Sequence, residues 1–456
     1  MTRRYTLPDY RRGSHVSAPI LPAKRPEPKR ETVSLPVAAP DVDEFADTEE
    51  AEHEESAPPA YHVMIGAVGK TPQYGLLGKV GELRVALDLN GCNTISLFGV
   101  QGGGKSYTLG VIAEMASLQV PNVNELPSPL GTVLFHYHRS DTYEPEHASA
   151  VRPNEKKGEI DRLLQDYGAS PAGLADIVLL TPEAKVAERQ AQYPEIQVEP
   201  LKFSSAEIGP EGWKFLLGAV GNQGLYVRQM VSIMRQLRGR LTVERLREEL
   251  KAADLKPDIA KIAEDRINLT AQYIDDERGL SSLLRPGRTV IVDLRDEWIE
   301  KEEALGLFVV LARIFGATRF NGEEFSKLFV FDEAHKYITQ SDLIGEVEAI
   351  IREMRHLKAT VLIASQDPLS VPRSVIELSS VLVLHRMTSP QWLKHLRGAI
   401  AALEKVTIGM VATLSPGEAL IWSRHCTDRR FTVAPQRVQI RPRFTAHGGG
   451  TKTAVG

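Results

Sequence analysis

The chain has few cysteines and lacks a long apolar segment. Only Cys92 and Cys426 occur in 456 residues. Because the two thiols have no metal-ligand spacing, they exclude a disulfide scaffold and are typical of a reducing cytoplasm. The longest apolar stretch, residues 305–317, is too short to span a bilayer and is interrupted by Arg313. The N-terminus also lacks the hydrophobic core of a signal peptide. The sequence therefore predicts a cytoplasmic protein without a membrane segment.

The main part of the chain also lacks an excess of either charge. The formal net charge is −4. Residues 1–40 carry eight Lys and Arg against three acidic residues, whereas residues 41–55 carry nine acidic residues and no Lys or Arg. The remaining chain holds equal numbers of basic and acidic side chains. A broad cationic surface for DNA is therefore not expected, and any contact with nucleic acid must be local.

What the sequence does contain is a set of apolar, β-rich runs separated by helical patterns. This alternation predicts an α/β fold with a mostly parallel, doubly wound sheet. The β-rich runs lie at residues 94–98, 132–137, 289–294, 328–331, 360–365, 381–385 and 419–422.

The sequence can be divided into six expected segments. The proline-rich, charge-segregated tail is either a solubilising segment or a tether for a partner or DNA. We expect a disordered tail (1–60), a small, barrel-like β element (61–92), the first part of a nucleotide-binding core (93–150), a mainly helical insertion (151–286), the second part of the core (287–435) and a C-terminal arm (436–456).

Residues 99–106 read Gly-Val-Gln-Gly-Gly-Gly-Lys-Ser and fit the Walker A pattern at every fixed position. The pattern stands between a predicted strand and a predicted helix, as phosphate binding requires. Lys105 is expected to reach the β- and γ-phosphates of ATP, and the Ser106 hydroxyl to ligate Mg²⁺. The remaining residues predicted to contact the nucleotide are Gly99, Gly102, Gly103, Gly104 and Tyr107.

A second motif supplies two carboxylates at the end of a predicted strand. The apolar run 328–331 is followed by Asp332 and Glu333, as in a Walker B motif. We expect Asp332 to hold Mg²⁺ and Glu333 to polarise the attacking water. Gln366 follows the run 360–365 and is interpreted as a sensor of the γ-phosphate, although it could also belong to a simple turn before Pro368.

Two arginines lie on one face of a helix predicted over residues 342–357. Arg352 and Arg355 are three positions apart and therefore neighbours on the helix surface. They could form surface ion pairs, for example between Glu348 and Arg352, or one could be an arginine finger for the nucleotide of a neighbouring subunit. The sequence leaves both interpretations open.

Together these motifs resemble the HerA/FtsK superfamily of ring-forming, DNA-translocating ATPases, and most closely its HerA-like branch. The similarity spans about residues 61–443 and is carried by the Walker A motif and by the ordered segments 284–294, 332–336, 352–355, 365–366, 384–390 and 414–419. The resemblance implies a RecA-like core, a homo-oligomeric and hexameric ring, ATP and Mg²⁺ at subunit interfaces, and duplex DNA in the channel. It also favours the finger interpretation of Arg352 and Arg355. Arg386 is a lesser candidate, either for coupling the nucleotide state to the subunit interface or for a structural salt bridge.

The chain departs from that family at three places. The β element 61–92 is shorter than the usual barrel, residues 136–143 replace an Asp-x-x-Gly-Glu-Tyr-like segment, and Gly103 stands where serine is usual. Two-lobed helicases that share Asp-Glu-Ala-His need a second lobe after this motif. We reject that family, because the residues beyond His335 look like the remaining strands of the first sheet.

We therefore expect an ATPase that translocates or unwinds DNA by sequence-independent backbone contacts. The alternative is an ATP-gated scaffold that recruits a nuclease or another effector; a secretion ATPase without a membrane span is a third possibility. Arg228, Arg235, Arg238 and Arg240 of the insertion are either candidate DNA contacts or an ordinary solvated helix face. The C-terminal Arg437, Arg441 and Arg443 fit an edge strand at least as well as a DNA clamp.

Overall fold

A computed structural model describes residues 60–219, 225–338 and 344–448. The predicted tail, apart from Ala60, and the end of the C-terminal arm lie outside these residues. The strands are β1 (Val63–Ile65), β2 (Tyr74–Val80), β3 (Leu83–Asp88), β4 (Thr94–Phe98), β5 (Asn124–Glu125), β6 (Gly131–His138), β7 (Ile177–Thr181), β8 (Gln197–Pro200), β9 (Thr289–Arg295), β10 (Arg319–Phe320), β11 (Glu323–Glu324), β12 (Lys327–Phe331), β13 (Ala359–Ser365), β14 (Val381–Leu384), β15 (Glu418–Ser423) and β16 (Gln436–Ile440).

Helices connect most of these strands. The α-helices are α1 (Lys105–Ser117), α2 (Lys157–Tyr167), α3 (Val186–Gln192), α4 (Pro210–Leu216), α5 (Leu225–Leu237), α6 (Val243–Ala252), α7 (Pro257–Ala271), α8 (Lys301–Ala317), α9 (Ile344–Met354), α10 (Arg373–Glu377), α11 (Pro390–Ala399), α12 (Ile408–Ala412) and α13 (Arg429–Val433). Among the residues described, no helix is long and apolar enough to cross a membrane.

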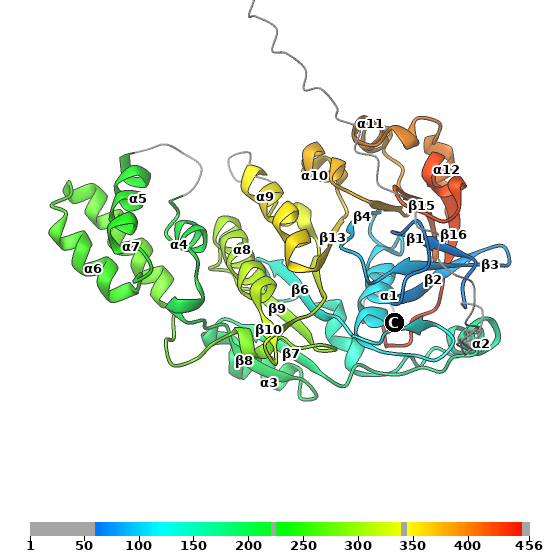
Figure 1. The fold of residues 1–456 in the computed structure, drawn as a ribbon, viewed down its shortest axis with the longest axis horizontal. Helices are drawn as coiled ribbons and strands as arrows, with labels where there is room; N and C mark the ends of the chain where they lie inside the picture. Colours follow the sequence, from blue (N-terminus) through cyan, green and yellow to red (C-terminus); the bar gives the residue numbers. More distant parts are fainter. Residues whose placement is uncertain (1–59, 220–224, 339–343, 449–456) are drawn as a thin grey trace, which may run out of the picture. The chain divides into compact units, whose positions relative to one another are not determined.

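The predicted mostly parallel sheet is confirmed. Strands β14, β4, β13, β12, β6, β9, β7 and β8 lie side by side in that order, and all of them are parallel. One strand, β13, separates β4 from β12, so the predicted Walker A and Walker B strands are not adjacent. Antiparallel β15 and β16 extend this sheet on the β14 side. The architecture is an α/β fold in which helices cover a large, mostly parallel sheet (Figure 1).

Alternate side chains of each central strand enter two separate hydrophobic clusters, because successive residues of a strand point to opposite faces. Phe329 and Phe331 face the cluster formed with α8 and α9, and Phe135 of β6 lies 4.8 Å from Phe308 of α8, centroid to centroid. Leu328 and Val330 face the other cluster, with α1. A sheet covered on both faces explains why these strands read as continuous apolar runs.

Two of the expected segments also take part in the central sheet. The small β element 61–92 continues it, because β2 pairs with β16. The insertion 151–286 contributes β7 and β8 besides its helices. Its helices α5, α6 and α7 pack on one another (green, Figure 1).

Candidate nucleotide-binding site

The Walker A segment forms the turn between β4 and α1, and its glycines are needed for steric reasons. Gly102 and Gly104 have φ angles of +70° and +102°, which disfavour other residues. A Cβ atom at Gly103 would lie 2.9 Å from the carbonyl oxygen of Val100. The departure from serine at this position therefore suits the close approach of two backbone segments. Since α1 begins at Lys105, the unpaired N–H groups of its first turn are available to phosphate.

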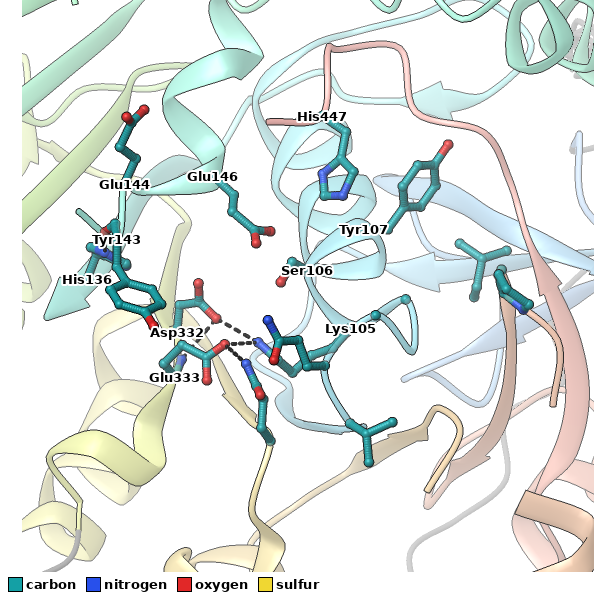
Figure 2. Close-up of a pocket in the computed structure, with 18 of the residues that line it drawn as sticks. Lys105, Ser106, Tyr107, His136, Tyr143, Glu144, Glu146, Asp332, Glu333 and His447 are labelled. Atoms are coloured by element: carbon teal, nitrogen blue, oxygen red, sulfur yellow. Dashed lines mark hydrogen bonds and ion pairs between the residues drawn. The ribbon is translucent and has the colours of Figure 1, made fainter. Parts of the chain in front are cut away.

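The structure brings the predicted Walker A lysine, both Walker B carboxylates and the predicted sensor together. Lys105 Nζ lies 3.1 Å from Asp332 Oδ1 and 2.9 Å from Glu333 Oε1. Gln366 Nε2 donates to Glu333 Oε1 at 2.7 Å. Figure 2 shows these contacts as one connected group. The group forms because β4, β12 and β13 are parallel neighbours whose carboxyl ends meet at one edge.

These contacts fix the charges of the group. Burial alone would lower the pKa of Lys105, but the charges of Asp332 and Glu333 raise it above its ordinary value. Burial would raise the pKa of Asp332, but Lys105 holds it below its ordinary value. The lysine is therefore cationic and Asp332 is anionic at neutral pH, although both are buried.

Glu333 has an unusual backbone conformation. Its φ of +50° lies in the left-handed region, which costs a residue with a Cβ on the order of 1 kcal/mol. The Tyr337 hydroxyl donates to the carbonyl oxygen of Asp332 at 2.9 Å and holds the turn. This turn directs the Glu333 carboxylate toward Lys105 instead of toward solvent.

A cavity of about 600 Å³ opens beside this group and has the size of a site for a nucleotide. Two buried carboxylate oxygens of the cavity lining, Glu146 Oε2 and Glu333 Oε2, have no hydrogen-bond partner among the described residues. Because buried polar atoms are nearly always paired, these atoms indicate a missing polar ligand. A nucleotide with its metal ion and waters fits this requirement.

The donor set also suits magnesium. Among the described residues, no three His, Cys, Asp or Glu side chains form a metal cluster. Mg²⁺ needs few protein ligands because it keeps several waters and binds substrate phosphates. Ser106 and Asp332, with Glu146 opposite Ser106 in Figure 2, provide such a sparse oxygen set. Burial and the charge of Asp332 raise the pKa of Glu146.

Sequence reasoning missed several histidines around the site. His136 and His138 alternate at the end of β6 and line the cavity. Burial lowers the pKa of His138 to about 4 and that of His147 to about 3, so both are neutral at pH 7. The available signal was the departure of residues 136–143 from the family pattern, since this segment includes the end of β6, the strand that pairs with the Walker B strand β12.

His385 is a further missed residue and lies beneath the Walker A turn. Its Nδ1 lies 2.9 Å from the carbonyl oxygen of Glu418, and its Nε2 lies 2.8 Å from Thr108 Oγ1. Since a carbonyl only accepts, Nδ1 carries the proton and Nε2 accepts from Thr108. A Cβ at Gly99 would lie 2.7 Å from His385 Cβ, so the glycine makes room for this ring.

The two candidate arginine fingers do not line the cavity of their own chain. Arg352 pairs with Glu348 at 3.2 Å, the surface pair considered as an alternative, and Arg355 donates to the carbonyl oxygen of Leu378. Both side chains are exposed. Arg386 contacts the Walker A turn through its backbone, since its carbonyl oxygen accepts from the Val100 N–H at 3.1 Å.

Two of the three C-terminal candidates for DNA contact are corrected by the structure. Arg441 and Arg443 are buried and lie 2.6 Å and 3.9 Å from the carboxylate of Glu114 in α1. They are therefore structural residues, and β16 is an interior strand between β15 and β2 instead of an edge strand. Arg437 is exposed but pairs with Glu418.

The insertion arginines remain candidates for DNA contact. Their side chains are all exposed on α5 and in the turn that follows it. These residues are Arg228, Arg235, Arg238 and Arg240.

Comparison with known proteins gives structural matches only. No protein-family model and no curated protein matches the chain. VirB4 of Thermoanaerobacter pseudethanolicus is 12% identical with a TM-score of 0.45, over 82% of this chain and 97% of that chain. The plasmid coupling protein TrwB in complex with ADP and Mg²⁺ is 11% identical with a TM-score of 0.47, over 78% and 86%.

A third match is the genome packaging NTPase B204 from Sulfolobus turreted icosahedral virus 2 in complex with AMPPCP. It is 9% identical with a TM-score of 0.32, over 76% of this chain and 97% of that chain. At such identities the likeness concerns the fold alone, and residue roles must be argued from the geometry of this chain.

Proposed function

We propose that this protein is an Mg²⁺-dependent ATPase that works as a ring-forming DNA translocase of the HerA type. The observation that carries the ATPase proposal is the bridge from Lys105 to Asp332 and Glu333 beside a cavity lined by the Walker A turn. The bridge gathers beside the cavity the charged groups that phosphoryl transfer to water requires, because positioning and charge stabilisation provide most of the catalysis.

Each residue of the group has a distinct proposed task. Lys105 turns from the carboxylates to the β- and γ-phosphates when ATP enters, which frees Glu333 to accept a hydrogen bond from the attacking water. Gln366 holds the Glu333 carboxylate in place through its amide. Ser106 and Asp332 would hold Mg²⁺, which neutralises charge on the phosphates when it is bound.

The proposal of a ring and a DNA substrate rests on the distribution of charge and on the exposed arginines. Outside the N-terminal tail the chain carries no net formal charge, which suits a ring in which only residues facing the channel are basic. The arginines of α5 are exposed and free to meet the phosphate backbone, and the two candidate fingers lie away from the cavity of their own chain. The exposed arginines fit contact with DNA, and the position of the candidate fingers fits an ATP site completed by a neighbouring subunit.

The test is ATP hydrolysis by Glu333→Gln with and without duplex DNA. We expect the variant to bind ATP like the wild type and to lose at least about 100-fold in turnover, because general-base catalysis contributes roughly 10²–10⁴-fold. Glu404→Gln, which changes an exposed carboxylate, is the matched control and should keep full activity.

Three outcomes decide between the proposals. Undiminished turnover in Glu333→Gln would remove the role given to Glu333. Stimulation of the wild type by duplex DNA supports a translocase. Hydrolysis that duplex DNA does not stimulate, together with ATP-dependent assembly with a nuclease, contradicts the translocase and supports the scaffold alternative.

A further inference from the structure

The cavity continues beyond the phosphate site, on the side away from Glu333. The residues that line this part include Tyr107, directly after Ser106, and residues of β16 and the segment that follows it. Its lining includes the apolar surface of Pro416, Ile440 and Pro442 together with charged side chains such as Glu159. Sites for nucleosides combine such apolar and aromatic surface with a few polar groups.

The C-terminal segment that forms this wall is fixed to the Walker A helix. Glu114 of α1 is 1% exposed and accepts from Arg441 Nη1 at 2.6 Å. It also accepts from the backbone N–H groups of Phe444 and Thr445, each at 3.1 Å. Since a buried carboxylate with several hydrogen bonds holds its partners firmly, the segment cannot move independently of α1.

Tyr107 connects this wall to the phosphate site. Its hydroxyl accepts from the Arg443 N–H at 2.8 Å and donates to Glu159 Oε2 at 2.7 Å. The hydroxyl is therefore fully used, and the ring is left as a rigid apolar surface. His447 packs edge-on against this ring at a centroid distance of 5.4 Å.

His447 presents a hydrogen-bond donor to the cavity. Its Nδ1 lies 3.3 Å from Arg443 Nη1, which can only donate, so the neutral ring carries its proton on Nε2. Burial lowers the pKa of His447 to about 4, so the ring is neutral at pH 7. Among the described residues, Nε2 has no hydrogen-bond partner. Figure 2 shows the ring above Ser106, facing the open part of the site.

We infer that the C-terminal segment from Gln439 to His447 is the nucleoside wall of the ATP site, with Tyr107 as its packing surface and His447 as a residue that touches the bound nucleoside. This inference rests on the proposed function. The γ-phosphate lies at the Lys105–Glu333 end of the cavity, so the ribose and base must extend toward this wall.

The test compares ATP with inorganic tripolyphosphate, which has the phosphates but no nucleoside. Affinities of both are measured by calorimetry in the presence of Mg²⁺ for the wild type, His447→Ala and His447→Gln. We expect His447→Ala to lose about fivefold in ATP affinity, the effect of one hydrogen bond, and to bind tripolyphosphate like the wild type. His447→Gln, which keeps a donor, should recover part of the loss. His425→Ala removes an exposed imidazole and should change neither affinity.

The outcomes separate this inference from the ATPase proposal. Unchanged ATP affinity in His447→Ala, or an equal loss for both ligands, overturns the nucleoside wall and leaves the ATPase proposal intact. A wild type that binds neither ATP nor tripolyphosphate overturns the proposed function and the inference with it.

Discussion

At the scale of single residues, Lys105 has two tasks that follow from its position. In the structure it neutralises two buried carboxylates that would otherwise repel each other. A buried cation between two anions is stable only while all three remain together. When phosphates take over the lysine, Asp332 and Glu333 lose that partner and need new ones, which metal and water can supply. The three charges therefore compensate one another within the chain, and each can take a new partner when ATP binds.

His385 gives a pH-dependent prediction at this scale. Burial lowers its pKa from an ordinary 6.5 to about 4. Between these values the unfolded chain binds more protons than the native one, so the free energy of unfolding falls as the pH falls. His385 lowers the free energy of unfolding by about 3 kcal/mol on acidification, and this loss is nearly complete at about pH 4.

We expect His385→Gln, which has no charge in either state, to lose less stability than the wild type between about pH 6.5 and about pH 4. Urea unfolding at several pH values measures the difference. The exposed His356 provides the control, and His356→Gln should keep the wild-type pH dependence. A variant at His385 with an unchanged pH dependence would contradict a buried neutral ring.

At the scale of elements, the Walker A helix depends on a segment more than 300 positions away in the sequence. Glu114 of α1 is the buried acceptor for Arg441 and the backbone of the C-terminal segment. Glu114→Gln removes the charge and leaves Arg441 and Arg443 buried without an anion. We expect a loss of about 3–5 kcal/mol in the free energy of unfolding.

Chemical denaturation followed by circular dichroism measures this loss. Glu377→Gln breaks an exposed helical pair with Arg373 and should cost at most about 1 kcal/mol. If the free energy of unfolding falls equally little in both variants, the contact between Glu114 and the C-terminal segment does not hold α1 in place.

The elements also show what sequence could and could not predict. The Walker A and Walker B strands were predictable because each is a short apolar run followed by polar residues of known chemistry, as at Lys105 and Asp332. The role of Arg441 and Arg443 was not, because their alternation with apolar residues is the same in an edge strand and in a buried one. Only the distant Glu114 decides between them. His447 carried no local signal, since it follows the last strand without a motif.

At the scale of the whole molecule, the proposed ring predicts that a neighbouring subunit adds an arginine to each ATP site. Arg162 is the one arginine among the described residues that line the cavity, and it comes from α2. The candidates Arg352 and Arg355 are engaged elsewhere on their own chain. An arginine finger can contribute on the order of 10³–10⁵ in rate. If either residue is the finger, it must act on a neighbouring subunit.

This arrangement predicts complementation between two inactive variants. Arg355→Ala, or Arg352→Ala if that residue is the finger, should bind ATP normally and lose about 10³-fold in turnover. Lys105→Ala should lose ATP binding but keep its arginines. In a mixed assembly, a Lys105→Ala subunit can donate its arginine to the intact site of its neighbour, so mixing should restore part of the hydrolysis.

Arg373→Ala, at another exposed arginine, should stay active alone. Mixtures that remain inactive would show that the arginine does not act between subunits, and full activity in both single variants would mean that neither residue is the finger.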